Sequence, residues 1–138
     1  MNKSVYINLP VENLERSKKF YSQLGYRFNP LYTNDVAACM IVSDTIHVML
    51  LTKPFFSTFT QKSIVDAKKN AQVLICVSAE NREAVDAHVT KALELGATAE
   101  RPPNDHSFMY ERSFSDLDGH IWEVMWMDEA AYKKAIIS

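Results

Sequence analysis

The chain has 138 residues, 47% of them hydrophobic and 23% charged, which is ordinary for one globular domain with a sizeable core. Its formal charge of −2 argues against a nucleic-acid-binding or membrane-surface protein, because both classes need a basic patch. No apolar run approaches the roughly 20 residues of a membrane span, and no signal segment opens the chain. Cys39 and Cys76 lie in apolar, strand-like runs, which is typical of reduced thiols. We therefore expect a cytoplasmic protein.

The first half of the chain reads as a β-α-β-β-β module. Residues 5–9 alternate with the period of a strand, which we expect Pro10 to end. Asn13 is the expected N-cap of a helix that runs to about Leu24, and Gly25 suits its C-terminal stop. Three further strands are expected between turn residues, at 26–28, 36–42 and 46–51.

Residues 53–70 interrupt this pattern and form the expected connector. Phe55, Phe56 and Phe59 precede a polar, lysine-containing segment, and we expect one or two short helical turns there. The pattern favours a connector whose aromatic side chains lie at the core edge. The alternative is an aromatic wall or lid over a pocket.

The second half repeats the order of the first. Residues 72–77 form a nearly continuous apolar run, which predicts a strand that is buried on both faces. A helix is expected over 81–95, with Gly96 as its stop, followed by a loop at 101–105. The remaining elements are strands at 108–114 and 121–126 and an amphipathic helix at 128–137. The chain therefore reads as a duplicated module of about 60 residues.

The last hairpin carries a carboxylate on a strand. Asp118-Gly119 predicts a two-residue type I′ turn. In the strand that follows, the two tryptophans share one face, suited to packing under a helix, and Glu123 lies on the other. An unpaired carboxylate there is costly, so we expect a partner, a metal ion or a wet cavity. The turn pairs Phe114 with Glu123, and four side chains then share the face of Glu123: Phe108, Tyr110, Arg112 and Phe114.

Two segments resemble the vicinal oxygen chelate superfamily, which includes glyoxalase I, extradiol dioxygenases and bleomycin-resistance proteins. Residues 7–25, with Asn8-Leu9-Pro10 and Leu24-Gly25, resemble its first module. Residues 116–123 are similar to its last hairpin, usually written D-P-D-G-x-x-x-E. The sequences of residues 108–110 and 122–126 resemble those of small bacterial proteins labelled "predicted lactoylglutathione lyase".

The resemblance implies a single α+β domain over residues 1–138. Its two βαβββ modules, about 1–60 and 70–128, would form a curled mixed sheet, a cup with helices packed outside. Members with two modules per chain commonly form homodimers, so a homodimer is expected.

The resemblance also implies positions for metal ligands. They fall on Tyr6, His47, Gln72 and Glu123, of which Tyr6 departs from the His or Gln usual in glyoxalases. The expected ligands of a divalent ion such as Ni, Zn, Co or Mn are therefore His47, Gln72 and Glu123. The single histidine of this set argues against the two-histidine iron site of an extradiol dioxygenase.

Two functions remain open. The first is a metal-dependent lyase or isomerase acting on an oxygen-chelating substrate such as a hemithioacetal, with Glu123 as the catalytic base. The second is a metal-free protein that binds a small molecule or sequesters a drug. The expected substrate-binding residues are Tyr6, Asn8, Met49, Phe108, Tyr110 and Arg112. Arg112 could instead form a salt bridge with Glu123.

Overall fold

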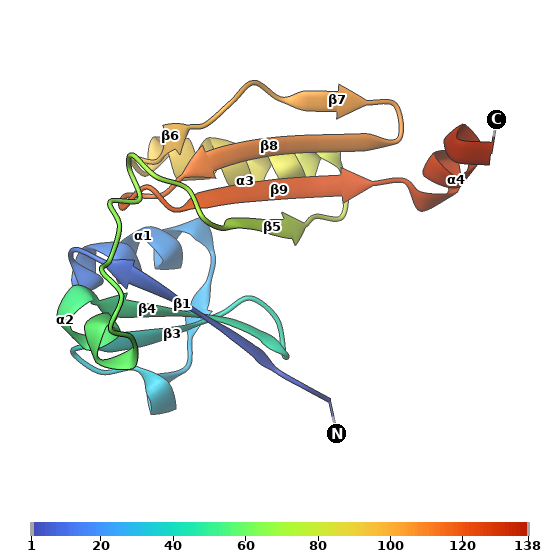
Figure 1. Ribbon diagram of the computed structural model, residues 1–138. Helices are drawn as coiled ribbons and strands as arrows, with labels where there is room; N and C mark the ends of the chain where they lie inside the picture. The colour runs from blue at the N-terminus through green and yellow to red at the C-terminus, as the bar shows by residue number, and fades with distance from the viewer. Residues whose placement is uncertain (1, 138) are drawn as a thin grey trace. The chain divides into compact units, whose positions relative to one another are not determined.

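The computed structural model describes residues 2–137 and divides the chain into two compact units between Asp66 and Ala67. Each unit holds one sheet (Figure 1). The strands of the first unit follow the order β1-β4-β3-β2, with β1 and β4 parallel and the other pairs antiparallel. Its elements are β1 (Val5–Val11), α1 (Leu14–Leu24), β2 (Arg27–Phe28), β3 (Ala37–Ile41), β4 (Ile46–Thr52) and α2 (Lys53–Phe56), with short 3₁₀ turns at Pro30–Tyr32 and Ser57–Phe59.

The boundaries of α1 follow the predicted capping residues. The Asn13 side chain accepts a hydrogen bond from the Arg16 amide, and Gly25 ends the helix with φ of 113°. The first strand, in contrast, does not end at Pro10 as predicted, because β1 continues to Val11. Within its unit β1 is the edge strand, where a residue without an N–H can be accommodated if its nitrogen faces away from the neighbouring strand.

The second unit repeats the topology of the first. Its strands follow the order β5-β9-β8-β6, with β5 and β9 parallel, so the predicted duplication of a β-α-β-β-β module is confirmed. The one addition is β7, which pairs with β8 and includes part of the predicted loop. The elements of the second unit are β5 (Leu74–Ser78), α3 (Arg82–Glu94), β6 (Thr98–Ala99), β7 (Asn104–His106), β8 (Met109–Ser115), β9 (Ile121–Met127) and α4 (Glu129–Ile137). No helix of residues 2–137 is both long and apolar enough to cross a membrane.

The core of the second unit lies between α3 and one face of its sheet (Figure 1). Val85 and Val89 of α3 are buried there, as are Trp122 and Val124 of β9, so the predicted tryptophan face does pack under a helix. The prediction that the 72–77 run is buried on both faces is wrong. β5 begins only at Leu74 and is the edge strand of its sheet, and it alternates between buried and exposed residues.

The connector contains the expected helical turns. After α2 and the 3₁₀ turn at Ser57–Phe59, residues 60–73 form neither helix nor strand, and the boundary between the two units falls among them. The rings of Phe55 and Phe59 meet edge to face, with centroids 5.1 Å apart. The ring of Phe59 nevertheless remains largely exposed.

The turn between β8 and β9 is one residue longer than predicted. The Asp116 amide donates to the His120 carbonyl, which leaves residues 117–119 as the loop. Only glycines have positive φ among residues 2–137, so Asp118 cannot belong to a type I′ turn, and Gly119 alone takes a positive φ, 98°. The β8–β9 register therefore shifts by one residue, and Phe114 pairs with Trp122 rather than with Glu123. Such a shift moves every side chain of β8 to the opposite face from the one predicted.

Replacing Asp116 by Ala should destabilise this turn. The Asp116 carboxylate is buried and accepts hydrogen bonds from the amides of Asp118 and His120, each 2.9 Å long. Losing both should lower the free energy of unfolding by about 1–3 kcal/mol, measured by urea denaturation. Asp116→Asn keeps an acceptor oxygen and should recover part of the loss, whereas equal losses in the two variants would contradict this role.

Candidate functional site

Four of the predicted site residues of the first unit share one face of its sheet. The register pairs Tyr6 with His47 and Asn8 with Met49, on the face opposite the buried side chains of Leu9 and Val48. The rings of Tyr6 and His47 stack with centroids 4.5 Å apart and planes 10° from parallel. His47 is 9% exposed, and its Nδ1 has no hydrogen-bond partner within residues 2–137. This face therefore presents an aromatic pair with one unsatisfied nitrogen.

The predicted ligand Gln72 does not lie on a strand. It precedes β5 and is exposed, because the strand begins two residues later than the apolar pattern indicated. His47 belongs to the first unit, and Gln72 and Glu123 belong to the second. Across the described part of the chain, no three His, Cys, Asp or Glu side chains are grouped so that they could hold a metal ion. The metal site stays a prediction.

Glu123 lies in the middle of a row of three polar side chains in the second unit. The register places Cys76 of β5 on one side of Glu123 and Ser113 of β8 on the other. Because directly paired residues point to the same face, all three side chains lie opposite the face that Trp122 and Val124 present to α3. Glu111 lies two residues from Ser113 on β8 and shares this face. We call it the open face of the second unit.

An arginine bridges the two carboxylates of the open face. Arg101 Nη2 lies 2.7 Å from Glu123 Oε2 and also contacts Glu111 Oε1. The side chains of Glu111 and Glu123 are only 12% and 17% exposed, whereas that of Arg101 is 44% exposed. Sequence reasoning expected a partner for Glu123 and left open a salt bridge from Arg112. The partner is Arg101 instead, and it lies in what was predicted to be a loop.

The cluster has more negative than positive groups, and this affects its titration. Burial raises the pKa of the Glu111 carboxyl, and the hydrogen bond and charge of Glu123 raise it further, while Arg101 acts in the opposite direction. Burial likewise raises the pKa of the Cys76 thiol, with the charges of Glu123 and Glu111 adding to the effect. One guanidinium therefore does not fully compensate two carboxylates.

The raised pKa of Glu111 predicts a pH-dependent stability. A carboxyl whose pKa is higher in the folded state stabilises the fold below its ordinary value of 4.5 and loses this contribution as pH rises through the folded value. The groups that face Glu111 are Glu123, Arg101 and Cys76. As pH rises from 4.5 through the folded-state pKa of Glu111, we expect the free energy of unfolding of Glu111→Gln to increase relative to that of the natural protein. Urea denaturation at several pH values measures it, and an unchanged difference at every pH would contradict it.

The other predicted binding residues of the second unit lie elsewhere. Tyr110 and Arg112 lie on the α3 side of the sheet, where both donate to the Asp86 carboxylate, at 2.7 and 3.0 Å. Phe114 is fully buried, and Phe108 precedes β8 and contacts the rings of His106 and Tyr132. The prediction that these side chains share the face of Glu123 is therefore wrong, because of the one-residue shift in register.

The residues that sequence reasoning missed are Arg101, Glu111 and Ser113. A three-residue turn in the last hairpin would have placed Ser113 opposite Glu123 and Glu111 on the same face. The hydrogen bonds of Asp116 select that turn, and a side chain that can accept from amides two and four residues later was the available signal. Arg101 gave no such signal, because its partners are 10 and 22 residues away.

Comparisons with known proteins agree with this fold. Residues 3–43 match the family model described as "Bleomycin resistance protein-like N-terminal". No curated protein matches the chain. Among solved structures, a hypothetical protein from S. aureus is 30% identical, with a TM-score of 0.77 over 91% of this chain and 95% of that one.

Two further solved structures have the same fold at lower identity. A glyoxalase/bleomycin resistance protein/dioxygenase family enzyme from Burkholderia phytofirmans is 16% identical, with a TM-score of 0.75 over 91% of this chain and 99% of that one. The fosfomycin resistance protein FosX from Mesorhizobium loti is 15% identical, with a TM-score of 0.69 over 96% and 98%. The predicted α+β fold with two βαβββ modules is confirmed.

Proposed function

We propose that the chain is a member of the glyoxalase/bleomycin resistance/dioxygenase superfamily and that it binds a small organic molecule on the open face of its second unit. The observation that carries the proposal is the Arg101–Glu123–Glu111 cluster. Polar groups of this kind on an otherwise apolar surface fix the orientation of a bound ligand. The open face also carries Met125 of β9, paired with Glu111, and Leu74 of β5 as apolar surface beside the cluster.

The ion pair also bears on the choice between ligand binding and metal chemistry. Glu123 Oε2 accepts a charge-assisted hydrogen bond from Arg101, so this carboxylate already binds a nitrogen-based cationic group in the fold. This favours Glu123 as an anchor for a polar organic group. The expected homodimer is compatible with such a role and stays a prediction.

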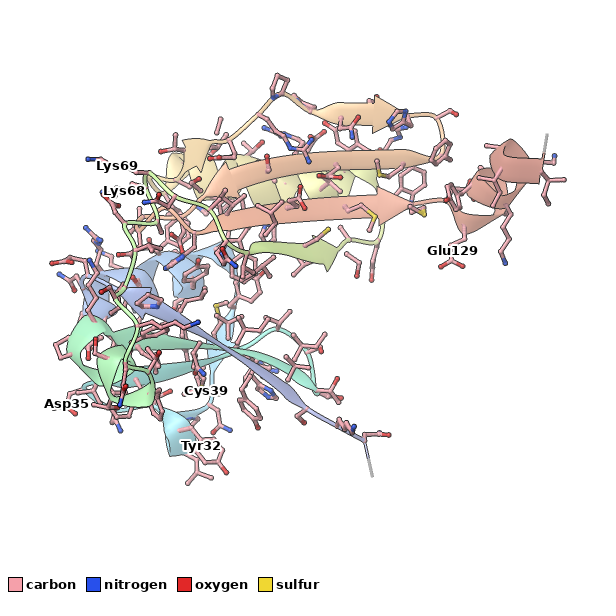
Figure 2. All side chains as sticks on the ribbon, viewed as in Figure 1. Tyr32, Asp35, Cys39, Lys68, Lys69 and Glu129 are labelled. Carbon is pink, nitrogen blue, oxygen red and sulfur yellow. The ribbon has the colours of Figure 1, made fainter. Side chains whose placement is uncertain are left out.

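A thermal-shift screen of small organic molecules tests this function. A bound ligand raises the stability by mass action, by about 2.7 kcal/mol at a concentration 100 times its dissociation constant. We expect the shift given by a true ligand to disappear in Glu123→Gln. The matched control is Glu129→Gln, which removes a carboxylate from α4, away from the cluster (Figure 2). Ligand shifts that are equal in the two variants would overturn the proposed site.

A metal-dependent lyase or isomerase is the second candidate. It is favoured by His47, whose buried Nδ1 has no partner within residues 2–137 and could bind a divalent ion. The other residues that would hold the ion are Gln72 and Glu123, and the ion would polarise the oxygens of a substrate such as a hemithioacetal. Elemental analysis of protein purified without chelator and offered nickel, zinc, cobalt and manganese tests this candidate. About one ion per chain, lost in both His47→Ala and Glu123→Gln, would support it, whereas no retained ion would reject it.

A further inference from the structure

Arg101 lies across the polar row of the open face. It belongs to the segment between β6 and β7, and both of these strands pair with β8. Its partner Glu123 lies on β9, the strand on the far side of β8. The Arg101 side chain must therefore cross β8, on the face that carries Glu111 and Ser113, to reach Glu123.

Ser113 provides a second and independent observation in this cluster. The residue is 3% exposed, and its hydroxyl has no hydrogen-bond partner within the described part of the chain. It is paired directly with Glu123, so the hydroxyl points to the face that Arg101 covers. A buried hydroxyl without a partner is unfavourable, and a ligand that bonds to it would recover that free energy.

We infer that the ligand carries a planar cation, a guanidinium or an amidinium, and that Arg101 occupies the place of this group until the ligand displaces it. The inference rests on the proposed function of the open face and adds the chemical class of the ligand. The ligand group takes over the contacts to Glu111 and Glu123 and bonds to the Ser113 hydroxyl.

The chemistry of the cluster favours such a cation. Arg101 contacts both carboxylates through one nitrogen, Nη2, so a planar cation with a second NH₂ group can make the same two contacts and also donate to the Ser113 hydroxyl. The two carboxylates exceed the one guanidinium in charge, so an anionic ligand would be repelled. Displacement is feasible because the Arg101 side chain is half exposed and its loop is anchored by no helix or long strand.

The test uses two probes of the same size and opposite charge, benzamidine and benzoate. Each is titrated by calorimetry or by NMR into the natural protein and into Arg101→Ala. Removing the competing side chain should tighten benzamidine binding about tenfold, while benzoate should bind neither protein. Arg101→Gln should behave like Arg101→Ala, which guards against a misfolded variant. Arg27→Ala removes an exposed arginine from the first unit and should leave benzamidine binding unchanged.

A second substitution in the Arg101→Ala protein identifies the residues that bind benzamidine. In the Arg101→Ala background, Glu123→Gln and Glu111→Gln should each abolish the gain, and Ser113→Ala should reduce it several-fold. If benzamidine binds Arg101→Ala no more tightly than the natural protein, the inference is overturned. If benzoate binds the natural protein and is lost in Arg101→Ala, Arg101 is instead a receptor for anions and the inference is again overturned. Either result leaves the proposed function intact if the screened ligands still depend on Glu123.

Discussion

Gly119→Ala should lower the free energy of unfolding by about 3 kcal/mol or more, or rearrange the β8–β9 hairpin. Two effects add at this position. Gly119 has φ of 98°, a conformation that L side chains rarely adopt. A Cβ there would also lie 2.6 Å from the Lys68 nitrogen and 2.7 Å from the Ala67 carbonyl carbon and oxygen. These are backbone atoms, so no side chain can rotate away to relieve the contact.

Gly25→Ala is the matched control for this prediction. Gly25 has a similar φ of 113°, but a Cβ added there would have no atom within 4 Å. The control should therefore show only the conformational strain, about 1–2 kcal/mol. Urea denaturation of both variants measures the difference. If Gly119→Ala were no more destabilising than Gly25→Ala, the close approach of residues 67–68 to the turn would not exist in solution.

Phe114→Ala should destabilise the protein by about 3–5 kcal/mol. Phe114 is fully buried beside Trp122 in the core under α3. Truncating its ring removes apolar burial and leaves a cavity that the surrounding β8, β9 and α3 side chains cannot fill without strain. Urea or thermal denaturation, followed by circular dichroism, measures the loss.

Ser113→Ala is the control from the opposite face of the same strand. Its hydroxyl is buried without a partner within residues 2–137, so its removal should change the stability little or slightly increase it. The pair of variants distinguishes the observed register from the one that a two-residue turn would give. In that alternative Phe114 would lie on the open face, and its replacement would cost far less than that of a core residue.

The predictable parts of this fold were those governed by local chemistry. Asn13 caps its helix as predicted, and Gly25 and Gly96 adopt the positive φ expected at helix ends. The alternation of residues 121–126 correctly separated the buried tryptophan face from the face of Glu123. Each of these features depends on a few neighbouring residues, and the sequence contains all of them.

The candidate site was harder to predict because it depends on register and on distant partners. Asp118-Gly119 is compatible with loops of two and of three residues, and the side chain of Asp116 decides between them. That single residue determines which side chains of β8 accompany Glu123. Arg101 lies in no periodic element, so nothing in its local sequence indicated that it spans β8. The face of Glu123 could therefore be predicted, whereas its neighbours on β8 depended on the turn that Asp116 selects, and Arg101 could not be predicted.

The pairing of first and last strands in each unit has a consequence for folding kinetics. Val5 pairs with Ile46 and Leu74 with Ile121, so each parallel pair closes a loop that contains almost the whole module. Such closure is entropically expensive and slow, whereas the β8–β9 hairpin needs only local contacts. We expect the hairpin to form early and the parallel pairs late. A chain arrested before that last step would present Glu123 and Ser113 together, but neither Cys76 beside them nor Tyr6 stacked on His47.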